Sequence, residues 1–162
     1  MAFIWDDSFL TGYNDIDDQH YHLVGLINAF GDFVEKGESS EELVEIIFKE
    51  LHDYTSYHFR EEEELMESEG IAPYFLDLHF KTHQDFLLKI IEMKKNARID
   101  EPATLQRLYE FLVHWLTNHI LGLDKTTTKQ ITAIKNGCDV EDAYQMVHKE
   151  INENLKNYQL SI

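Results

Sequence analysis

Six ionisable residues of this 162-residue chain stand at positions where the sequence pattern calls for apolar side chains. Along four segments, apolar residues recur every three or four positions, as on the buried face of an amphipathic helix. A polar group buried there without a partner costs several kcal/mol, so these residues are expected to share a purpose. They are His20, His58, Glu62, His79, His83 and His119.

The histidines also occupy matching places along their helices. His20 lies near the start of the first helix, His58 near the end of the second, His79 and His83 near the start of the third, and His119 near the end of the fourth. Because successive helices of an up-down bundle run in opposite directions, these places meet at one end of the bundle. All five imidazoles are therefore expected to converge at one level.

Two spacings place ligand-type side chains on one helix face. His58 and Glu62 are four residues apart, as are His79 and His83, and residues four apart are neighbours on a helix surface. Imidazole and carboxylate groups at this spacing can share one metal ion or one pair of ions. The rest of the acidic run at residues 61–64 is expected to be a solvated helix face.

Asp124 is a further candidate, although its spacing is less regular. It follows His119 by five residues, about 140° round an ideal helix, so the two side chains share a face only where the backbone loosens. Gly122 lies between them and would permit this. Asp124 is therefore expected to join the site.

The number and type of these groups indicate a metal pair. Five imidazoles and two carboxylates are too many ligands for one ion, whereas two irons bridged by the carboxylates would use all seven and zinc would be satisfied with four. The single cysteine, Cys138, can form neither a thiolate cluster nor an intrachain disulfide, which fits a reducing compartment.

Helices must hold these residues. The first is expected to be capped by Asp17 or Asp18 and to stop at Gly37, and the second to open at a capping box of Ser39 and Glu42.

The later helix boundaries are expected at Gly70, at about Tyr74 and at Pro102, which suits the first turn of a helix. The Thr-rich stretch 125–129 is expected to interrupt the helical pattern, and Asp139 to cap a last helix.

The sequence predicts an all-α fold, an up-down-up-down four-helix bundle with an N-terminal arm and an additional C-terminal helix. Residues 1–130 are expected to form the bundle, and residues 131–162 a helical extension.

The net charge narrows the range of partners. Fourteen basic against thirty-one acidic residues give a formal charge of -17, which repels nucleic acid and anionic lipid surfaces. The sequence has no apolar stretch near the roughly 20 residues that span a bilayer, and residues 1–7 have no features of a signal peptide. A soluble, cytoplasmic protein is expected.

Several segments of the chain match a known family together. They are IDDQH at 16–20, YHFREE at 57–62, the His79/His83 pair, and the segment 115–124 with Trp115, Leu116, His119, Ile120 and Asp124. Over about residues 1–130 the chain resembles the hemerythrin family, especially its bacterial members.

The resemblance implies reversible dioxygen binding at a non-haem di-iron centre with an oxo or hydroxo bridge. By this resemblance, one iron would be held by His79, His83 and His119. The other iron would be held by His20 and His58. Glu62 and Asp124 would bridge the two irons. By the same resemblance, the apolar lining of the dioxygen pocket would be Phe59, Trp115, Leu116 and Ile120.

The alternative is a di-iron oxidase or peroxidase, or an iron-handling protein. Ferritin-like di-iron enzymes use paired Glu-x-x-His motifs and about four carboxylates, whereas this site is rich in histidine and has two. The sequence also has no His-Glu-x-x-His motif of a metalloprotease. The domain itself is therefore expected to be non-catalytic.

The C-terminal helix leaves two roles open. Its apolar residues Val140, Tyr144, Val147, Ile151 and Tyr158 have a heptad-like spacing, which suits either packing on the bundle or self-association. By resemblance, such an extension could connect an oxygen sensor domain to a signalling output such as a diguanylate cyclase or a chemotaxis receptor. A dioxygen carrier is the other possibility.

Overall fold

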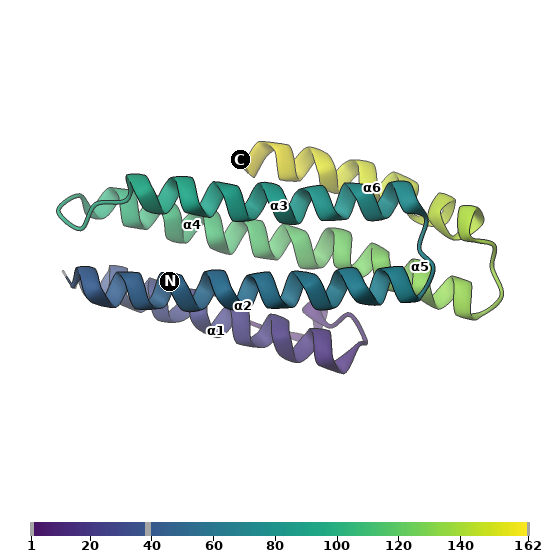
Figure 1. Cartoon of the computed structure of the whole chain (residues 1–162), viewed down its shortest axis with the longest axis horizontal. Coiled ribbons are helices and arrows are strands. Elements are labelled where there is room, and N and C mark those ends of the chain that lie inside the picture. Colours follow the sequence, from purple (N-terminus) through teal and green to yellow (C-terminus); the bar gives the residue numbers. More distant parts are fainter. Residues whose placement is uncertain (1, 38–39, 162) are drawn as a thin grey trace.

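The fold, seen in a computed structural model, is the predicted helical bundle. The structure describes residues 2–37 and 40–161, with side chains described up to residue 156. Four long helices run alternately up and down (Figure 1), and each packs on two of the others. They are α1 (Asn14–Glu35), α2 (Glu41–Ser68), α3 (Pro73–Asn96) and α4 (Pro102–His119).

Most helix boundaries follow the local signals. α1 and α2 end beside Gly37 and Gly70, whose φ angles of 64° and 72° lie in the left-handed region that glycine adopts without strain. α3 and α4 each begin with a proline. The predicted cap Ser39 lies outside the described residues. The N-cap of α2 is Ser40, whose side chain accepts a hydrogen bond from the Leu43 N–H.

The expected cap of α1 at Asp17 or Asp18 is wrong. The helix begins at Asn14, and Asp17 lies in its first turn. The Asp17 carboxylate instead accepts hydrogen bonds from the N–H groups of Thr11 and Gly12 and from the Thr11 hydroxyl, at 2.7 to 3.1 Å. Asp17 therefore ties the start of α1 to the preceding arm and does not cap the helix.

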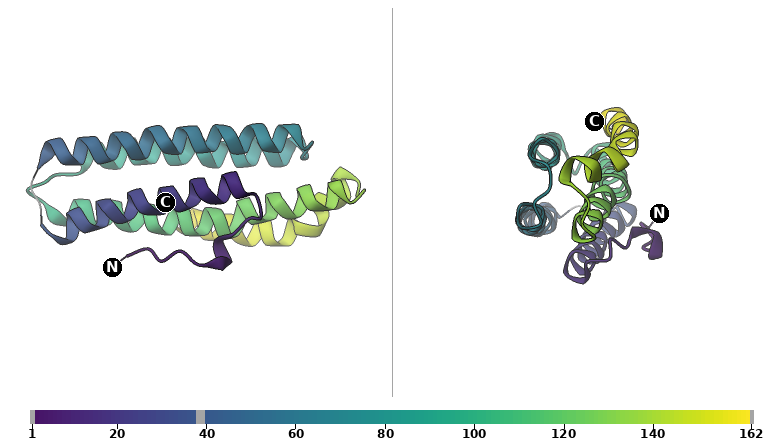
Figure 2. Two further views of the ribbon diagram at one scale, coloured as in Figure 1. Left: turned by 90° about the horizontal axis from the view of Figure 1, so that it is seen from below. Right: turned by 90° about the vertical axis from the view of Figure 1, so that its right-hand side faces the viewer.

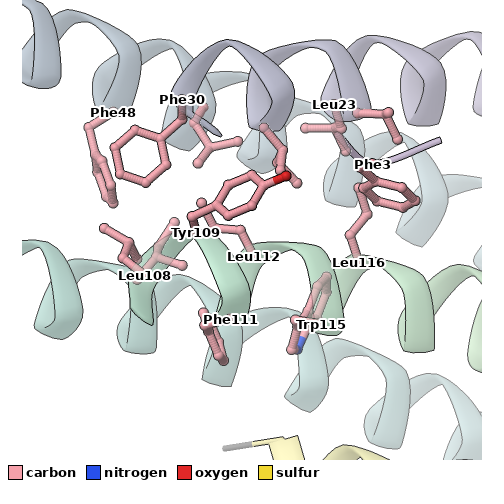
Figure 3. Close-up of a cluster of buried hydrophobic side chains, with 14 of the residues drawn as sticks. Phe3, Leu23, Phe30, Phe48, Leu108, Tyr109, Phe111, Leu112, Trp115 and Leu116 are labelled. Carbon is pink, nitrogen blue, oxygen red and sulfur yellow. The ribbon is translucent and has the colours of Figure 1, made fainter. Parts of the chain in front are cut away.

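The N-terminal arm contains one 3-10 turn (η1, Asp7–Phe9). Hydrogen bonds and buried aromatic side chains hold the arm against the bundle. The Phe3 backbone exchanges two hydrogen bonds with the Asn28 side chain, at 2.7 and 2.9 Å, and Lys125 donates to the Ser8 carbonyl. Phe3 and Phe9 are buried in the main core. Figure 3 shows Phe3 beside Leu23 and Leu116.

Beyond α4 the chain stays helical where an interruption was expected. One turn of π-helix, η2 (Ile120–Asp124), leads directly into α5 (Lys125–Lys135). The hydroxyls of Thr126 and Thr127 donate to the Leu123 carbonyl, so these threonines satisfy their own polar groups within the helix. The Thr-rich composition was therefore a misleading signal.

The last helix, α6 (Val140–Ser161), turns back along the bundle after Gly137 and packs on α4, η2 and α5 (Figure 2). Ala143, Val147 and Ile151 are fully buried there. The extension thus packs on the bundle. Among the described residues, no helix is long and apolar enough to cross a membrane.

Candidate metal centre

The five histidines predicted to converge do so in the interior of the bundle. α1, α2 and α4 contribute His20, His58 and His119, and α3 contributes His79 and His83. None exposes more than 2% of its surface. Two groups of side chains that could hold a metal ion include all five.

The first group consists of three imidazoles with Glu62. The Nε2 atom of His119 lies 3.1 Å from Nε2 of His79 and 2.9 Å from Nε2 of His83. Two metal–nitrogen bonds of about 2.1 Å at right angles place their nitrogens about 3.0 Å apart. The observed distances therefore fit three nitrogens on one ion.

The second group consists of His20 and His58 with Glu62. The two imidazole rings meet edge to face with their centroids 4.6 Å apart. The Nε2 atoms of His20 and His58 lie 3.9 and 3.7 Å from the two oxygens of Glu62. This side of the site offers one nitrogen fewer than the other.

Each carboxylate faces both groups. Asp124 has Oδ1 at 3.1 Å from Nε2 of His79 and of His119, while its Oδ2 lies 3.2 Å from Nε2 of His20. Glu62 has Oε2 at 3.4 Å from Nε2 of His83, and its Oε1 faces His20. Both carboxylates are thus placed to bridge two ions.

The π-helical turn brings Asp124 into the site. Because hydrogen bonds in a π-helix join residues five apart, η2 places His119 and Asp124 on the same face. The expected loosening is present, and Gly122 lies within the loosened turn. A Cβ atom at Gly122 would lie 2.9 Å from Cγ of Asn154, so its missing side chain makes room for α6.

Several buried polar atoms of the site lack a well-aligned hydrogen bond within the described part of the chain. They are both ring nitrogens of His20, Nε2 of His58, Nδ1 of His119, Oε2 of Glu62 and both carboxylate oxygens of Asp124. Unsatisfied polar atoms in an interior are costly and rare. Nε2 and carboxylate oxygens, which dominate this set, are the atoms that ligate metals, so the residues fit a metal pair.

The electrostatics of the site also suit metal binding. Burial, together with the neighbouring imidazoles, lowers the pKa of His58 and of His83 well below its usual value, which favours the neutral ligand form. Burial and the nearby Asp124 raise the pKa of Glu62. Burial would also raise the pKa of Asp124, but the histidines around it, His119 first, hold that pKa well below its usual value.

Three outer hydrogen bonds, which sequence reasoning missed, orient the histidine rings. Nδ1 of His58 lies 2.8 Å from Oε1 of Gln19, and Nδ1 of His83 lies 2.9 Å from Oε1 of Glu63. Metal-binding histidines generally donate their second ring nitrogen to such partners.

The third outer bond joins Nδ1 of His79 to the hydroxyl of Thr127 at 3.3 Å. The only signals in the sequence were that Gln19 precedes His20 and that Glu63 follows Glu62. The acidic run 61–64 predicts a solvated position for Glu63, whereas its side chain is only 29% exposed and bonds His83.

Aromatic and aliphatic side chains enclose the site. Phe59 stacks on His83 with centroids 3.8 Å apart, and Trp115 stacks on His119 at 4.3 Å. Phe59, Trp115 and Leu116 line a small apolar cavity (Figure 3 shows the last two), whereas Ile120 is buried without lining it. Sequence reasoning did not identify the other residues of the cavity wall, which are Leu23, Ile27, Leu51, Thr55 and Phe86.

The remaining histidines lie elsewhere. His22, His52, His114 and His148 belong to neither group of potential ligands found among the described residues. His22 is exposed, and its ring packs on Tyr54 at 4.2 Å.

Known proteins resemble this chain over most of its length. A family model, the hemerythrin HHE cation binding domain, matches residues 11–129. A bacteriohemerythrin of Pseudomonas paraeruginosa is 36% identical over 121 residues, 75% of this chain and 76% of that protein. A bacteriohemerythrin of Stenotrophomonas maltophilia is 31% identical over 82% of this chain and 84% of its own length. Myohemerythrin-1 of Phascolopsis gouldii is 32% identical over 75% and 88%. No solved structure matches the chain significantly.

Proposed function

The chain belongs to the hemerythrin family, and we propose that it binds dioxygen reversibly at a pair of non-haem irons. The observation that carries this proposal is the placement of Glu62 and Asp124, each of which faces both histidine groups. Two carboxylates between three imidazoles and two imidazoles form a ligand set for two ions, not for one.

The proposed ligands form the same two groups as the distances between their side-chain atoms. His79, His83 and His119 would hold one iron, His20 and His58 the other, and the two carboxylates would bridge them. When bound, the iron pair supplies the electrons that dioxygen takes up on binding and returns on release. We assign dioxygen entry to the side of His20 and His58, because it offers one nitrogen fewer.

The protein's own part is to supply neutral nitrogens, hold the carboxylates in place and exclude water. Phe59 and Trp115 cover the rings of His83 and His119, and both also line a small apolar cavity in the bundle interior. An apolar surrounding admits dioxygen and disfavours water and anions. Glu62 and Asp124 face both histidine groups, so both would be engaged as bridging ligands.

The test is iron content together with reversible optical change. Purified protein is expected to contain about two irons per chain and no haem. Its visible absorption should change when dioxygen is added to the reduced protein and return when dioxygen is removed. One zinc and no iron would overturn the proposal. Iron with steady turnover of dioxygen would support the alternative, an oxidase or peroxidase, and irons released on reduction would support iron handling.

The physiological role, carrier or sensor, depends on α6. This helix packs on η2, which contributes Asp124, so a change at the site can reach α6 directly. We favour an oxygen or redox sensor whose output domain or second subunit would read the state of α6. A free-standing carrier in which α6 only covers the bundle is the other candidate.

A further inference from the structure

The three outer partners of the histidine rings differ in charge. The side chain bonded to His58 is the neutral amide of Gln19, and that bonded to His79 is the hydroxyl of Thr127. Only the partner of His83, the carboxylate of Glu63, carries a charge. An imidazole that donates to a carboxylate becomes a more basic metal ligand than one that donates to an amide. The two sides of the site therefore differ in more than the number of nitrogens.

Glu63 determines which nitrogen of His83 faces the site. Its Oε1 lies 2.9 Å from Nδ1 of His83, while Nε2 of the same ring lies 2.9 Å from Nε2 of His119. A carboxylate can only accept here, so Nδ1 carries the hydrogen and the Nε2 lone pair points to the centre. Phe59 lies parallel to the ring, with an interplanar angle of 2°. Phe59 thus fixes the plane of the ring, and Glu63 fixes its orientation within that plane.

Glu63 is partly exposed to solvent, which allows its carboxylate to remain charged close to the site. It belongs to α2 but contacts α3, so its bond crosses a helix interface. Its side chain is 29% exposed, whereas that of His83 is 2% exposed. Water can therefore solvate one part of the carboxylate while another part bonds the buried ring, and the charge needs no second buried partner.

Building on the proposed di-iron site, we propose that Glu63 is a positioning residue that sets the reduction potential of the iron pair. It holds Nε2 of His83 toward the centre, and its negative charge stabilises the oxidised pair relative to the reduced pair. The charge acts on the three-histidine side, opposite the side assigned to dioxygen entry.

Two substitutions separate the effect of the Glu63 hydrogen bond on ring position from the effect of the Glu63 charge. Glu63→Gln keeps an oxygen that can accept from Nδ1 but removes the charge, whereas Glu63→Ala removes both. Glu64→Gln is the matched control, because it removes the same charge one residue further along α2 from an exposed side chain. We expect Glu63→Gln to bind iron as the native protein does and to have a higher reduction potential, measured by redox titration of the visible spectrum. Glu64→Gln should leave the potential unchanged.

Metal affinity and the tautomer of the His83 ring test the positioning role of Glu63 independently of the reduction potential. Loss of an outer partner typically weakens metal binding by about 10- to 100-fold, so Glu63→Ala should lose affinity to this extent while Glu63→Gln keeps it. In the metal-free protein, nitrogen NMR of His83 should show the hydrogen on Nδ1 in the native chain and in Glu63→Gln, and a mixture of tautomers in Glu63→Ala.

The outcomes distinguish failure of the role proposed for Glu63 from failure of the proposed di-iron function. A native potential in Glu63→Gln, or an equal shift in Glu64→Gln, would overturn the role of the Glu63 charge. A native tautomer in Glu63→Ala would overturn its positioning role. Absence of iron from the native protein would instead contradict the proposed function, while the tautomer measurement would still test Glu63.

Discussion

Histidines in this chain differ in what surrounds their ring nitrogens. His83 is buried with one nitrogen bonded to Glu63 and the other directed at His119, whereas the exposed ring of His22 packs on Tyr54. Burial and the partners of the ring nitrogens thus distinguish a proposed ligand such as His83 from a surface histidine such as His22.

Replacing His83 should therefore disrupt the metal centre, and replacing His22 should not. His83→Ala removes a proposed ligand and is expected to weaken iron binding at least about 10-fold, with loss of the stabilisation that bound metal gives to a folded protein. His22→Ala should retain iron and melting temperature. Elemental analysis and thermal unfolding would measure both. Iron retained in His83→Ala but lost in His22→Ala would show that the ligand assignment is wrong.

Leu116 is expected to protect the site from water. It lines the apolar cavity beside Trp115, so Leu116→Ala should admit water and anions and speed conversion of the oxygenated protein to the ferric form. Iron content should barely change. The autoxidation rate, followed by absorption, is the measurement.

Leu105→Ala is the matched control for Leu116→Ala. Leu105 lies in the same helix and is equally buried, but it does not line the cavity. Each substitution should cost about 2 to 5 kcal/mol of stability, because each deletes a buried leucine side chain. If Leu105→Ala accelerated autoxidation as much as Leu116→Ala, general loosening of the core would explain the effect.

At the scale of secondary structure, η2 and α6 depend on each other. A Cβ atom at Gly122 would lie 2.9 and 3.0 Å from Cγ and Cβ of Asn154, so Gly122→Ala must displace α6 or the turn that carries Asp124. We expect a loss of about 1 to 3 kcal/mol, as for other overpacked sites, together with lower iron content. Chemical denaturation and elemental analysis would measure these effects.

A second substitution tests the cause of that loss. Asn154→Ala removes the atom closest to the added methyl group, so it should partly restore stability and iron content to Gly122→Ala. Gly25→Ala is the control for glycine replacement in a helix, because an added Cβ there meets no atom within 4 Å. It should stabilise the protein by up to about 1 kcal/mol. No recovery in the double variant would rule out the Asn154 contact as the cause.

The attachment of α6 to α3 should depend on pH. The Tyr74 hydroxyl donates to Oε2 of Glu141 at 2.6 Å. Burial and this bond raise the pKa of Tyr74 to about 12, and the same bond, with one from Gln145, lowers the pKa of Glu141. The stabilisation is therefore lost as pH rises from the usual tyrosine range toward 12. At the acid side it is lost as pH falls through the lowered pKa of Glu141.

Tyr74→Phe removes this bond with little change in volume. The difference in melting temperature between native protein and Tyr74→Phe should be small and positive near neutral pH and should disappear in acid, below the usual titration range of glutamate. A difference that stays constant across this range would mean that the hydrogen bond contributes nothing to the docking of α6.

For the whole molecule, the arrangement of η2 against α6 predicts how a signal would travel. A ligand shifts a conformational equilibrium only through interactions that differ between the two states, and Asp124 links the site to η2 and so to α6. Hydrogen exchange in residues 125–158 should therefore differ between the reduced and the oxygenated or oxidised forms, more than in the part of α1 remote from His20. Identical exchange, with a monomer in both states, would favour the carrier.

The positions of the four main helices and of the proposed ligands were largely predictable from the sequence alone. A residue's neighbours three and four positions away are determined by backbone geometry, so the pairs His58/Glu62 and His79/His83 must share a face wherever a helix forms. Antiparallel packing then brings the ends of the helices together.

Features that depend on contacts between distant segments were decided by the tertiary structure. The spacing of His119 and Asp124 predicted a loosened turn, but the close approach of Asn154 in α6 to Gly122 could not be predicted from that spacing. Whether Glu63 faced solvent or His83 depended on α3, and whether α6 docked or projected depended on the apolar surface that α3, η2 and α5 present to it. Local periodicity shows which face of a helix is apolar, but the partner of that face is set by burial of surface elsewhere in the fold.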